Sequence, residues 1–395
     1  MNTKRLFAIL TASALLVGTL AGCGGSEDAS TSESGGETGT VKDVQVWATG
    51  SDNVRQTFEK LVDDFNANSE YAGTYEAKLN FILSGTGGGT LADQLVAAYK
   101  AGQTDTEFDV VDLGDDDLTK ILSLTDESVL EDLDMSKIPN AEGVTAEPVA
   151  AKGKIQPYRG TTVILAYNSE TVPEDEVPTT MDELVEWIKA HPGRFAYNTP
   201  GTGGAGDSFV RTSIYNFIDD DSALMSSDPK WMEQWDEGFA FLKELHPYMY
   251  KSGSSVVYPN KNQGTLDLLT QGEIDMCPNW ADMVLSQRKA GTVPEKIKIT
   301  TIEPSFTGSV QGIAVPSYSG NKEGGFAFID YLLSPEAQTI LVQDMAAIPL
   351  VTEGVDLTGA EELMSMDVSN FRTQALGDLV TDLNARWDEE IGTLG

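Results

Sequence analysis

The sequence holds 395 residues, of which 62 are Asp or Glu and 26 are Lys or Arg, and its formal net charge is −36. A charge of that sign repels nucleic acid and anionic lipid surfaces, so we expect neither as a partner, although it is compatible with a cationic ligand. The chain has only two cysteines and two histidines and no cluster of them, so we expect no disulfide, no metal site and no cofactor.

The N-terminus has the pattern of an export signal. A basic pair precedes an apolar stretch from Leu6 to Leu20, which is too short to span a bilayer with margin. The stretch ends in Leu20-Ala21-Gly22-Cys23, which resembles the lipobox of bacterial lipoproteins. We therefore expect a signal peptide at 1–22 and an acylated Cys23, which would anchor the protein to the cell membrane through lipid only. The alternative is an ordinary signal peptide with an accidental cysteine.

A polar segment separates this signal from the folded body. Residues 23–40 are mostly Gly, Ser, Thr, Glu and Asp, and they cannot bury enough apolar surface to offset the entropy of ordering. We expect a flexible tether here and a folded body that begins near Val41, outside the cytoplasm. The body has about 355 residues, a length that favours two domains over one.

Short β-rich runs alternate with amphipathic helices along the body, which is the pattern of an α/β protein. We expect strands at 44–47, 79–83, 109–113, 162–167, 195–197, 274–277 and 313–316. We expect helices at 54–66, 91–101, 231–245 and 326–333, one that begins at 265–270, and one that begins after an N-cap at Thr180.

The order of short motifs along the body resembles the extracellular solute-binding proteins of bacterial ABC importers. Each motif is weak alone, and their shared order carries the resemblance. They are Val46-Trp47, Asp109-Val110-Val111, Ala166-Tyr167-Asn168, Pro178-Thr179-Thr180-Met181-Asp182-Glu183-Leu184, Gln271-Gly272-Glu273-Ile274-Asp275-Met276 and Leu332-Leu333-Ser334-Pro335-Glu336-Ala337-Gln338.

This resemblance implies a two-lobed periplasmic-binding-protein-like fold of type II, with hinge strands and an inter-lobe cleft that holds the ligand. It places lobe 1 at 41–165 plus 310–353, and lobe 2 with the C-terminal helices at 166–309 plus 354–395. The first crossing is expected near 164–168 and the return near 309–313. The implied partners are a small-molecule ligand and the transmembrane subunits of an ABC permease, and we expect a monomer.

Two glycine-rich loops follow expected strands, one in each lobe. Glycines at a helix N-terminus present backbone N–H groups to an anion or a hydroxyl, so Gly85 and Thr86 of the first loop are candidate contacts. The second loop supplies the candidates Thr202, Gly203 and Asp207, with Arg211 one turn into the next helix. The alternative is that both loops are simple turns with helix caps.

Aromatic and charged side chains near strand ends are the other candidates for ligand contact: Trp47, Asp115, Tyr158, Arg159, Trp280 and Asp282. Trp280 follows a strand at a position where many sugar-binding relatives place a stacking aromatic ring. Core packing is the alternative for such a ring. Asp115 opens an acidic run at 115–117, which is either a cleft edge or a solvated turn.

A sugar or oligosaccharide is the favoured ligand, from the aromatic and Asp/Asn content of these segments. The alternatives are a polyamine, a thiamine-like cation, or a phosphorylated solute, which Arg211 and the paired loops would favour. We expect no enzyme, because no Gly-x-Ser-x-Gly motif is present and neither histidine accompanies a nucleophile. The remote alternatives are a secreted glycan-active enzyme, since acidic residues are abundant, and a surface adhesin.

Overall fold

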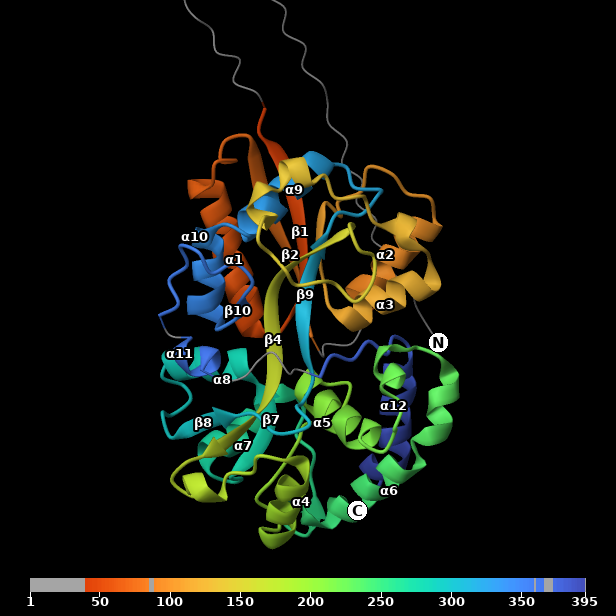
Figure 1. The fold of residues 1–395 in the computed structure, drawn as a ribbon, viewed down its shortest axis with the longest axis vertical. Helices are drawn as coiled ribbons and strands as arrows, with labels where there is room; N and C mark the ends of the chain where they lie inside the picture. Colours follow the sequence, from red (N-terminus) through yellow and green to blue (C-terminus); the bar gives the residue numbers. More distant parts are fainter. Residues whose placement is uncertain (1–39, 85–88, 359, 366–371, 395) are drawn as a thin grey trace, which may run out of the picture. The chain divides into compact units, whose positions relative to one another are not determined.

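The computed structural model of the protein describes residues 40–84, 89–358, 360–365 and 372–394 (Figure 1). Cys23, Gly85 and Thr86 lie outside the described residues, as does nearly all of the expected signal peptide and tether. In the described ranges, no helix is long and apolar enough to cross a membrane.

Lobe 1 is the part of the body built around the sheet of β1, β2, β3 and β9 (Figure 1). β1 pairs in parallel with β2 and β3, and β9 joins the sheet antiparallel to β3. Its strands are β1 (Lys42–Gly50), β2 (Tyr75–Leu83), β3 (Val110–Leu113) and β9 (Gly308–Ala314). Its helices are α1 (Asp52–Asn68), α2 (Leu91–Lys100), α3 (Asp115–Leu124), α9 (Lys322–Leu332) and α10 (Pro335–Ile340).

Helices cover both faces of this sheet, so its central strands are buried. Val44 and Val46 of β1 pack with Phe58 and Phe65 of α1 in one apolar cluster. On the other face, Val111 of β3 packs in a second cluster with residues of α2 and α3. Successive side chains of a strand point to opposite faces, which is why both faces carry apolar residues.

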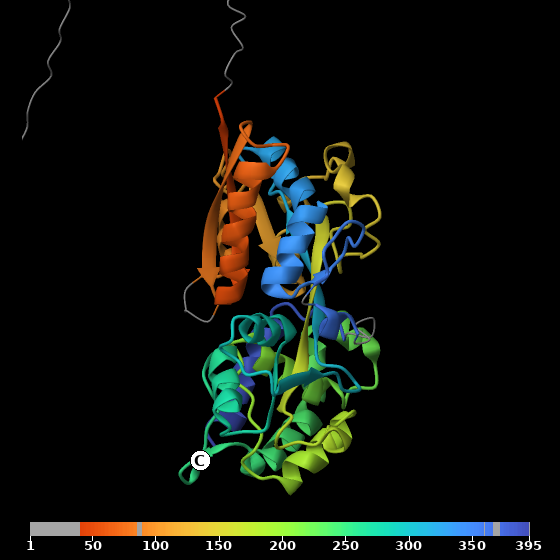
Figure 2. The same ribbon diagram turned by 90° about the vertical axis from the view of Figure 1, so that its left-hand side faces the viewer.

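A single strand, β4 (Ile155–Asn168), runs from lobe 1 into lobe 2 (Figures 1 and 2). From Ile155 to Thr162 it pairs antiparallel with β9, and from Val163 onward it pairs with β7 and β8. A short strand, β10 (Ile348–Pro349), pairs with β4 near Gly160. β4 is therefore a strand of both sheets. The numbered boundaries of the two lobes stay a prediction.

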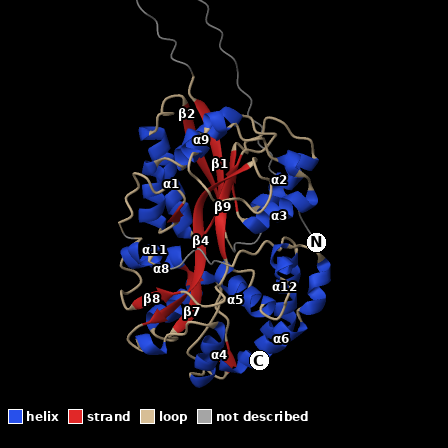
Figure 3. Cartoon of the chain, in the orientation of Figure 1, coloured by secondary structure: helices blue, strands red, loops and turns tan. Residues whose placement is uncertain are grey.

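Lobe 2 is the part built around β4, β7 and β8, again with helices on both faces (Figure 3). Val163 and Leu165 of β4 pack in one apolar cluster, whereas Ile164 and Ala166 pack in another on the opposite face. Its strands are β7 (Met276–Trp280), β8 (Ile297–Thr300) and the small pair β5 (Lys251–Ser252) and β6 (Ser255–Val256). Its helices are α4 (Met181–Ala190), α5 (Gly204–Tyr215), α6 (Asp236–Leu245), α7 (Lys261–Gln271), α8 (Ala281–Lys289), α11 (Glu361–Met364) and α12 (Leu379–Trp387).

The structure corrects several sequence-based boundaries. The expected strand at 195–197 is an extended segment in which Phe195 forms a single bridge with Met276. The expected helix at 231–245 divides into a 3-10 helix, Pro229–Gln234, and α6, because the chain turns at Trp235. The run at 115–117 is the first turn of α3 and neither a strand end nor a free turn, since acidic side chains are favourable at a helix N-terminus. The expected N-cap at Thr180 is confirmed and forms a capping box with Glu183.

Candidate functional site

A cavity of about 490 Å³ lies where the two lobes and the crossing strands meet. Lobe 1 contributes the ends of β1 and β2 and the starts of α1 and α3, and lobe 2 contributes the starts of α5, α7 and α8. β4 and β9 form its floor through Arg159, Thr161, Ser309 and Gln311. The charged residues among its lining are Asp52, Asp115, Asp116, Asp117, Asp207, Asp282, Arg159, Arg211 and Lys261.

None of the five helices that start at the cavity is capped by the side chain of its N-cap residue. The N-cap residues of α1, α3 and α8 are Ser51, Gly114 and Trp280, and none of their side chains accepts a bond from the first turn. Helices that start elsewhere, such as α2 and α10, are capped by Thr90 and Ser334. Uncapped first-turn N–H groups are donors that need an acceptor from solvent or solute. The cavity wall thus includes backbone donors.

The start of α5 is built by close backbone contacts. The Gly206 amide donates to Asn198 Oδ1 over 2.8 Å, and the Ala205 amide donates to Asn262 Oδ1 over 3.1 Å. A Cβ on Gly206 would lie 1.9 Å from the Asn198 carbonyl oxygen, and one on Gly204 would lie 2.8 Å from Cζ2 of Trp280. Glycine is required at both positions, so that the helix start can reach Asn198 and the indole ring can lie against it.

Two lobe 2 side chains bond to lobe 1 beside the cavity. Arg211 Nη1 lies 2.7 Å from Asp116 Oδ2, and Asp282 Oδ2 accepts from Asn53 Nδ2 over 2.8 Å. The Leu376 amide of lobe 2 also donates to Asp116 Oδ1 over 3.1 Å. The two lobes are therefore in contact through charged hydrogen bonds in this structure.

Several buried polar atoms of the lining have no hydrogen-bond partner among the described residues. They are Asp115 Oδ2, Asp282 Oδ1, Arg211 Nε, and both amide atoms of Gln374. The exposed fractions of Asp115, Asp282 and Arg211 are 8%, 6% and 9%. Buried polar groups are almost always hydrogen-bonded, and leaving one unbonded costs about 1–3 kcal/mol. Acceptors and donors without partners in one cavity indicate a site for a polar solute.

Burial also changes the acidity of the lining carboxyls. Burial, followed by the nearby Asp116 charge, raises the pKa of Asp115 to about 7. Burial and Asp116 together raise the pKa of Asp117 to about 6, and burial raises the pKa of Asp207 and Asp282. A group with so high a pKa is partly protonated near neutral pH, so Asp115 can donate as well as accept a hydrogen bond.

A buried network holds Arg159 at the cavity floor. Its Nε donates to the Tyr158 hydroxyl over 2.9 Å, and that hydroxyl donates to Asp112 Oδ1 over 2.9 Å. Arg159 and Tyr158 are neighbours at a bulge in β4, and the Arg159 guanidinium lies over the Tyr158 ring, 5.5 Å from its centroid; Arg159 lines the cavity, whereas Tyr158 lies in the core of lobe 1. The role of Tyr158 here is to orient Arg159 from behind.

Eight of the residues expected to touch a ligand line this cavity: Asp115, Arg159, Thr202, Gly203, Asp207, Arg211, Trp280 and Asp282. Trp280 is half-buried, and it also packs against an apolar cluster of lobe 2. The expected contacts at Tyr158 and Trp47 are placed elsewhere by the structure. Gly85 and Thr86 lie outside the described residues, so their part in the site stays a prediction.

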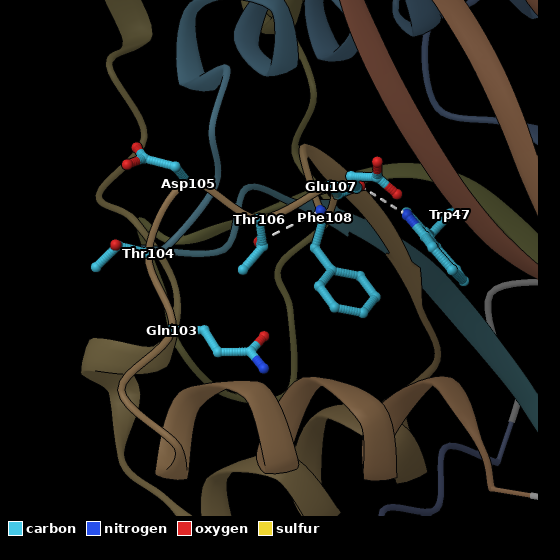
Figure 4. Close-up of a pocket in the computed structure, with 7 residues that line it drawn as sticks. All are labelled: Trp47, Gln103, Thr104, Asp105, Thr106, Glu107 and Phe108. Atoms are coloured by element: carbon cyan, nitrogen blue, oxygen red, sulfur yellow. Dashed lines mark hydrogen bonds between the residues drawn. The ribbon is translucent and has the colours of Figure 1, made fainter. Parts of the chain in front are cut away.

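Trp47 lines a different, surface hollow formed with residues 103–108 (Figure 4). Its Nε1 donates to the Glu107 carbonyl oxygen over 2.8 Å, and its ring centroid lies 4.8 Å from that of Phe108. Figure 4 shows the indole beside Phe108, with Gln103 and Thr104 on the side of Phe108 away from the indole. Trp47 therefore makes these contacts within lobe 1 and does not line the inter-lobe cavity.

Several other residues that line the inter-lobe cavity were not predicted from the sequence. Gln374, Asn262, Lys261 and Gln311 belong to no motif, and Asp116 was interpreted only as part of an acidic run. Asp116 could have been found from its position in the first turn of an expected helix after a buried strand. In the described part of the chain, no group of three or more His, Cys, Asp or Glu side chains is arranged to hold a metal ion.

The chain belongs to the bacterial extracellular solute-binding proteins, because the model of that family matches residues 60–368. The family consists of extracellular solute-binding proteins and not of enzymes. Membership of it indicates that the protein acts outside the cytoplasm. A search of the curated proteins finds no match.

Solved structures share the fold over nearly the whole body. An ABC transporter protein of Clostridium perfringens is 16% identical, with 88% of this chain and 98% of that chain covered and a TM-score of 0.61. The spermidine/putrescine ABC transporter substrate-binding protein of Streptococcus pneumoniae is 14% identical, with 88% and 99% covered and a TM-score of 0.62. The periplasmic binding protein AfuA of Actinobacillus pleuropneumoniae, with fructose-6-phosphate bound, is 16% identical, with 89% and 100% covered and a TM-score of 0.60. The expected two-lobed periplasmic-binding-protein fold of type II is confirmed.

The raised pKa of Asp115 predicts a specific dependence of stability on pH. The folded chain keeps the Asp115 proton up to about pH 7, whereas an unfolded chain releases it near the ordinary value of 3.8. The folded state then binds more protons between these values, so the free energy of unfolding contributed by this group falls as the pH rises from about 4 to about 7. Urea unfolding at pH 4, 5, 6 and 7 should show this loss.

Asp115→Asn should make that slope measurably smaller, because an amide does not titrate in this range, while Asp117, whose pKa is also raised, keeps its own contribution. The matched control is Asp182→Asn, which changes an exposed aspartate in the first turn of α4. An unchanged slope in Asp115→Asn would show that the Asp115 carboxyl ionises normally in the folded protein.

Proposed function

We propose that this protein captures a polyhydroxylated solute, a sugar or an oligosaccharide, in the inter-lobe cavity and delivers it to the permease of an ABC importer. The observation that carries the proposal is the mixture of unpartnered donors and acceptors in the cavity wall. Arg211 Nε donates, Asp282 Oδ1 accepts, and both lie within one cavity that Trp280 also lines. A hydroxyl group both donates and accepts, and an aromatic face fits the apolar face of a sugar ring.

The chemistry of the wall disfavours a phosphorylated solute. Asp116 neutralises Arg211 by direct contact, and six aspartates against three cationic side chains line the cavity. A phosphate would meet an excess of negative charge in a site with little solvent to screen it. The expectation that Arg211 would favour such a solute therefore loses its support.

A cationic solute is the second candidate, because the same excess of aspartates would attract it. Asp115 has no counter-charge bonded to it among the described residues, and a polyamine or thiamine-like cation would supply one. A polyamine, however, only donates hydrogen bonds, and it would leave Arg211 Nε and the uncapped first turns of α1 and α3 without an acceptor. We place it after a sugar for this reason.

Delivery to a permease rests on membership of the family, and attachment to the membrane rests on the sequence around Cys23. A lipid on Cys23 and a polar tether would keep the body near the membrane without burying it there. We propose that the protein works in this position as a monomer, since each step needs only one cavity and one pair of lobes.

A direct test of the solute class is a binding screen on the full chain. Glucose, maltotriose, spermidine and glucose 6-phosphate are added separately at 1–10 mM, and the melting temperature is measured. A solute that binds the native state adds RT ln(1 + [L]/Kd) to its stability, which is about 2.7 kcal/mol at a hundredfold excess over Kd. We expect a rise with a sugar. A rise with spermidine alone would assign the cavity to cations.

The contribution of Trp280 is tested by Trp280→Ala. Stacking on the solute predicts an affinity for the bound sugar weaker by about 2–4 kcal/mol in calorimetry, as for a buried contact residue. The half-buried ring predicts a smaller loss of stability than Trp235→Ala, which removes a fully buried indole and should cost about 3–5 kcal/mol. Unchanged affinity with a large fall in melting temperature would make Trp280 a core residue only.

The anchor is tested by Cys23→Ser. Without a thiol to acylate, the protein should leave the membrane fraction or accumulate as a longer precursor, while the circular dichroism of the body stays the same. Fractionation and mass spectrometry of the N-terminus measure this outcome. A mature N-terminus at any residue other than Cys23 would rule out the lipoprotein hypothesis.

A further inference from the structure

Two hydrogen bonds that join the lobes are made by side chains that also line the cavity. Asp282 and Arg211 belong to α8 and α5 of lobe 2, and their partners Asn53 and Asp116 belong to α1 and α3 of lobe 1. The donor–acceptor distances are 2.8 Å and 2.7 Å. The Arg211–Asp116 pair joins two oppositely charged groups, and such bonds are stronger than bonds between neutral groups.

Each of the two lobe 2 side chains uses one polar atom for this bond and keeps another without a partner. Asp282 bonds Asn53 through Oδ2, and Oδ1 has no partner among the described residues. Arg211 bonds Asp116 through Nη1, and Nε has none. The same side chains thus join the lobes and present one acceptor and one donor to a solute.

Asn53 differs from the other three residues because it lies behind the cavity wall. Its neighbours Asp52 and Val54 line the cavity, whereas Asn53 does not. The Ser51 hydroxyl donates to Asn53 Oδ1 over 2.5 Å, which leaves the amide nitrogen to face Asp282. The first turn of α1 therefore fixes both the position and the orientation of this donor.

We infer that Asn53 is a positioning residue of the solute site, which holds Asp282 across the cavity and so stabilises the closed arrangement of the lobes. The part of this inference that concerns the solute rests on the proposed function. The part that concerns closure of the lobes does not. If the lobes separate, Asp282 loses its partner Asn53, and Asp282 and Arg211 of lobe 2 move together away from Asp115 of lobe 1, whose Oδ2 also has no partner among the described residues. A solute that bonds Asp115 as well as Asp282 or Arg211 therefore favours the closed arrangement, and closure in turn favours the solute.

The test measures closure without any solute, by hydrogen–deuterium exchange of the full chain. The peptide that contains Leu376 is the reporter, because the Leu376 amide donates across the cavity to Asp116 and makes no contact with Asn53. Separation of the lobes exposes this amide, whereas a local disturbance of α1 does not.

Two variants of Asn53 and one control are compared with the wild type. Asn53→Ala removes the donor, and Asn53→Asp keeps the size but places a second carboxylate opposite Asp282. Aspartate is favourable in the first turn of a helix, so α1 should fold in this variant. The control is Asn68→Ala, since Asn68 Nδ2 donates to Asp64 Oδ1 over 2.7 Å on the same helix, within one lobe.

We expect exchange at Leu376 to be roughly tenfold faster in Asn53→Ala, because loss of the hydrogen bond to Asp282 raises the population of separated lobes, and faster still in Asn53→Asp. Asn68→Ala should leave it unchanged. Wild-type exchange in both Asn53 variants, or an equal increase in Asn68→Ala, would overturn the inference.

A second series repeats the wild-type measurement with 10 mM maltotriose. Slower exchange at Leu376 would support both the sugar site and its link to closure. No effect of maltotriose, together with fast exchange in the Asn53 variants, would count against this sugar while leaving the role of Asn53 in closure intact.

Discussion

The arrangement of the two lobes around the cavity depends on one buried strand, β4, which contributes hydrogen bonds to the sheets of both lobes. Its first half pairs with β9 in lobe 1 and its second half pairs with β7 and β8 in lobe 2. Alternate side chains of the second half enter two different apolar clusters, so the strand cannot shift in register without exposing both. Because that strand is fixed, the helix starts on either side of it face one another, and the cavity forms between them.

The cavity combines two kinds of chemistry that separate parts of the fold supply. Lobe 1 brings carboxylates on uncapped helix starts, and lobe 2 brings Arg211, Asp282 and the indole of Trp280. Lobe 2 alone presents a donor and an acceptor, Arg211 and Asp282, and lobe 1 adds Asp115 from its own side of the cavity. A site of this kind is complete only when the lobes are together, which is the property that a capture protein needs.

The sequence predicted the α/β class, the lobe architecture and much of the cavity, because strand ends and glycine-rich helix starts are visible as local patterns. Trp47 was misplaced because the expected strand stopped at residue 47, which made an interior residue of β1 look like a strand end. Tyr158 was misplaced because the expected strand began at residue 162, whereas β4 begins at Ile155 and has a bulge between Pro157 and Arg159, so that Tyr158 lies in the core of lobe 1 and Arg159 lines the cavity. The contact between Asn53 and Asp282 depends on how two lobes approach, and no local pattern encodes that distance.

The pairing of β3 with β9 has a consequence for how the chain reaches this structure. Val111 lies opposite Ala314, so the sheet of lobe 1 is completed by a segment about two hundred residues further along. Contacts between residues so far apart in sequence form late and slow the search for the native topology. During synthesis from the N-terminus, β1, β2 and β3 therefore wait with an unpaired edge at β3 until most of lobe 2 has been made, and this edge is a place where the nascent chain can associate wrongly.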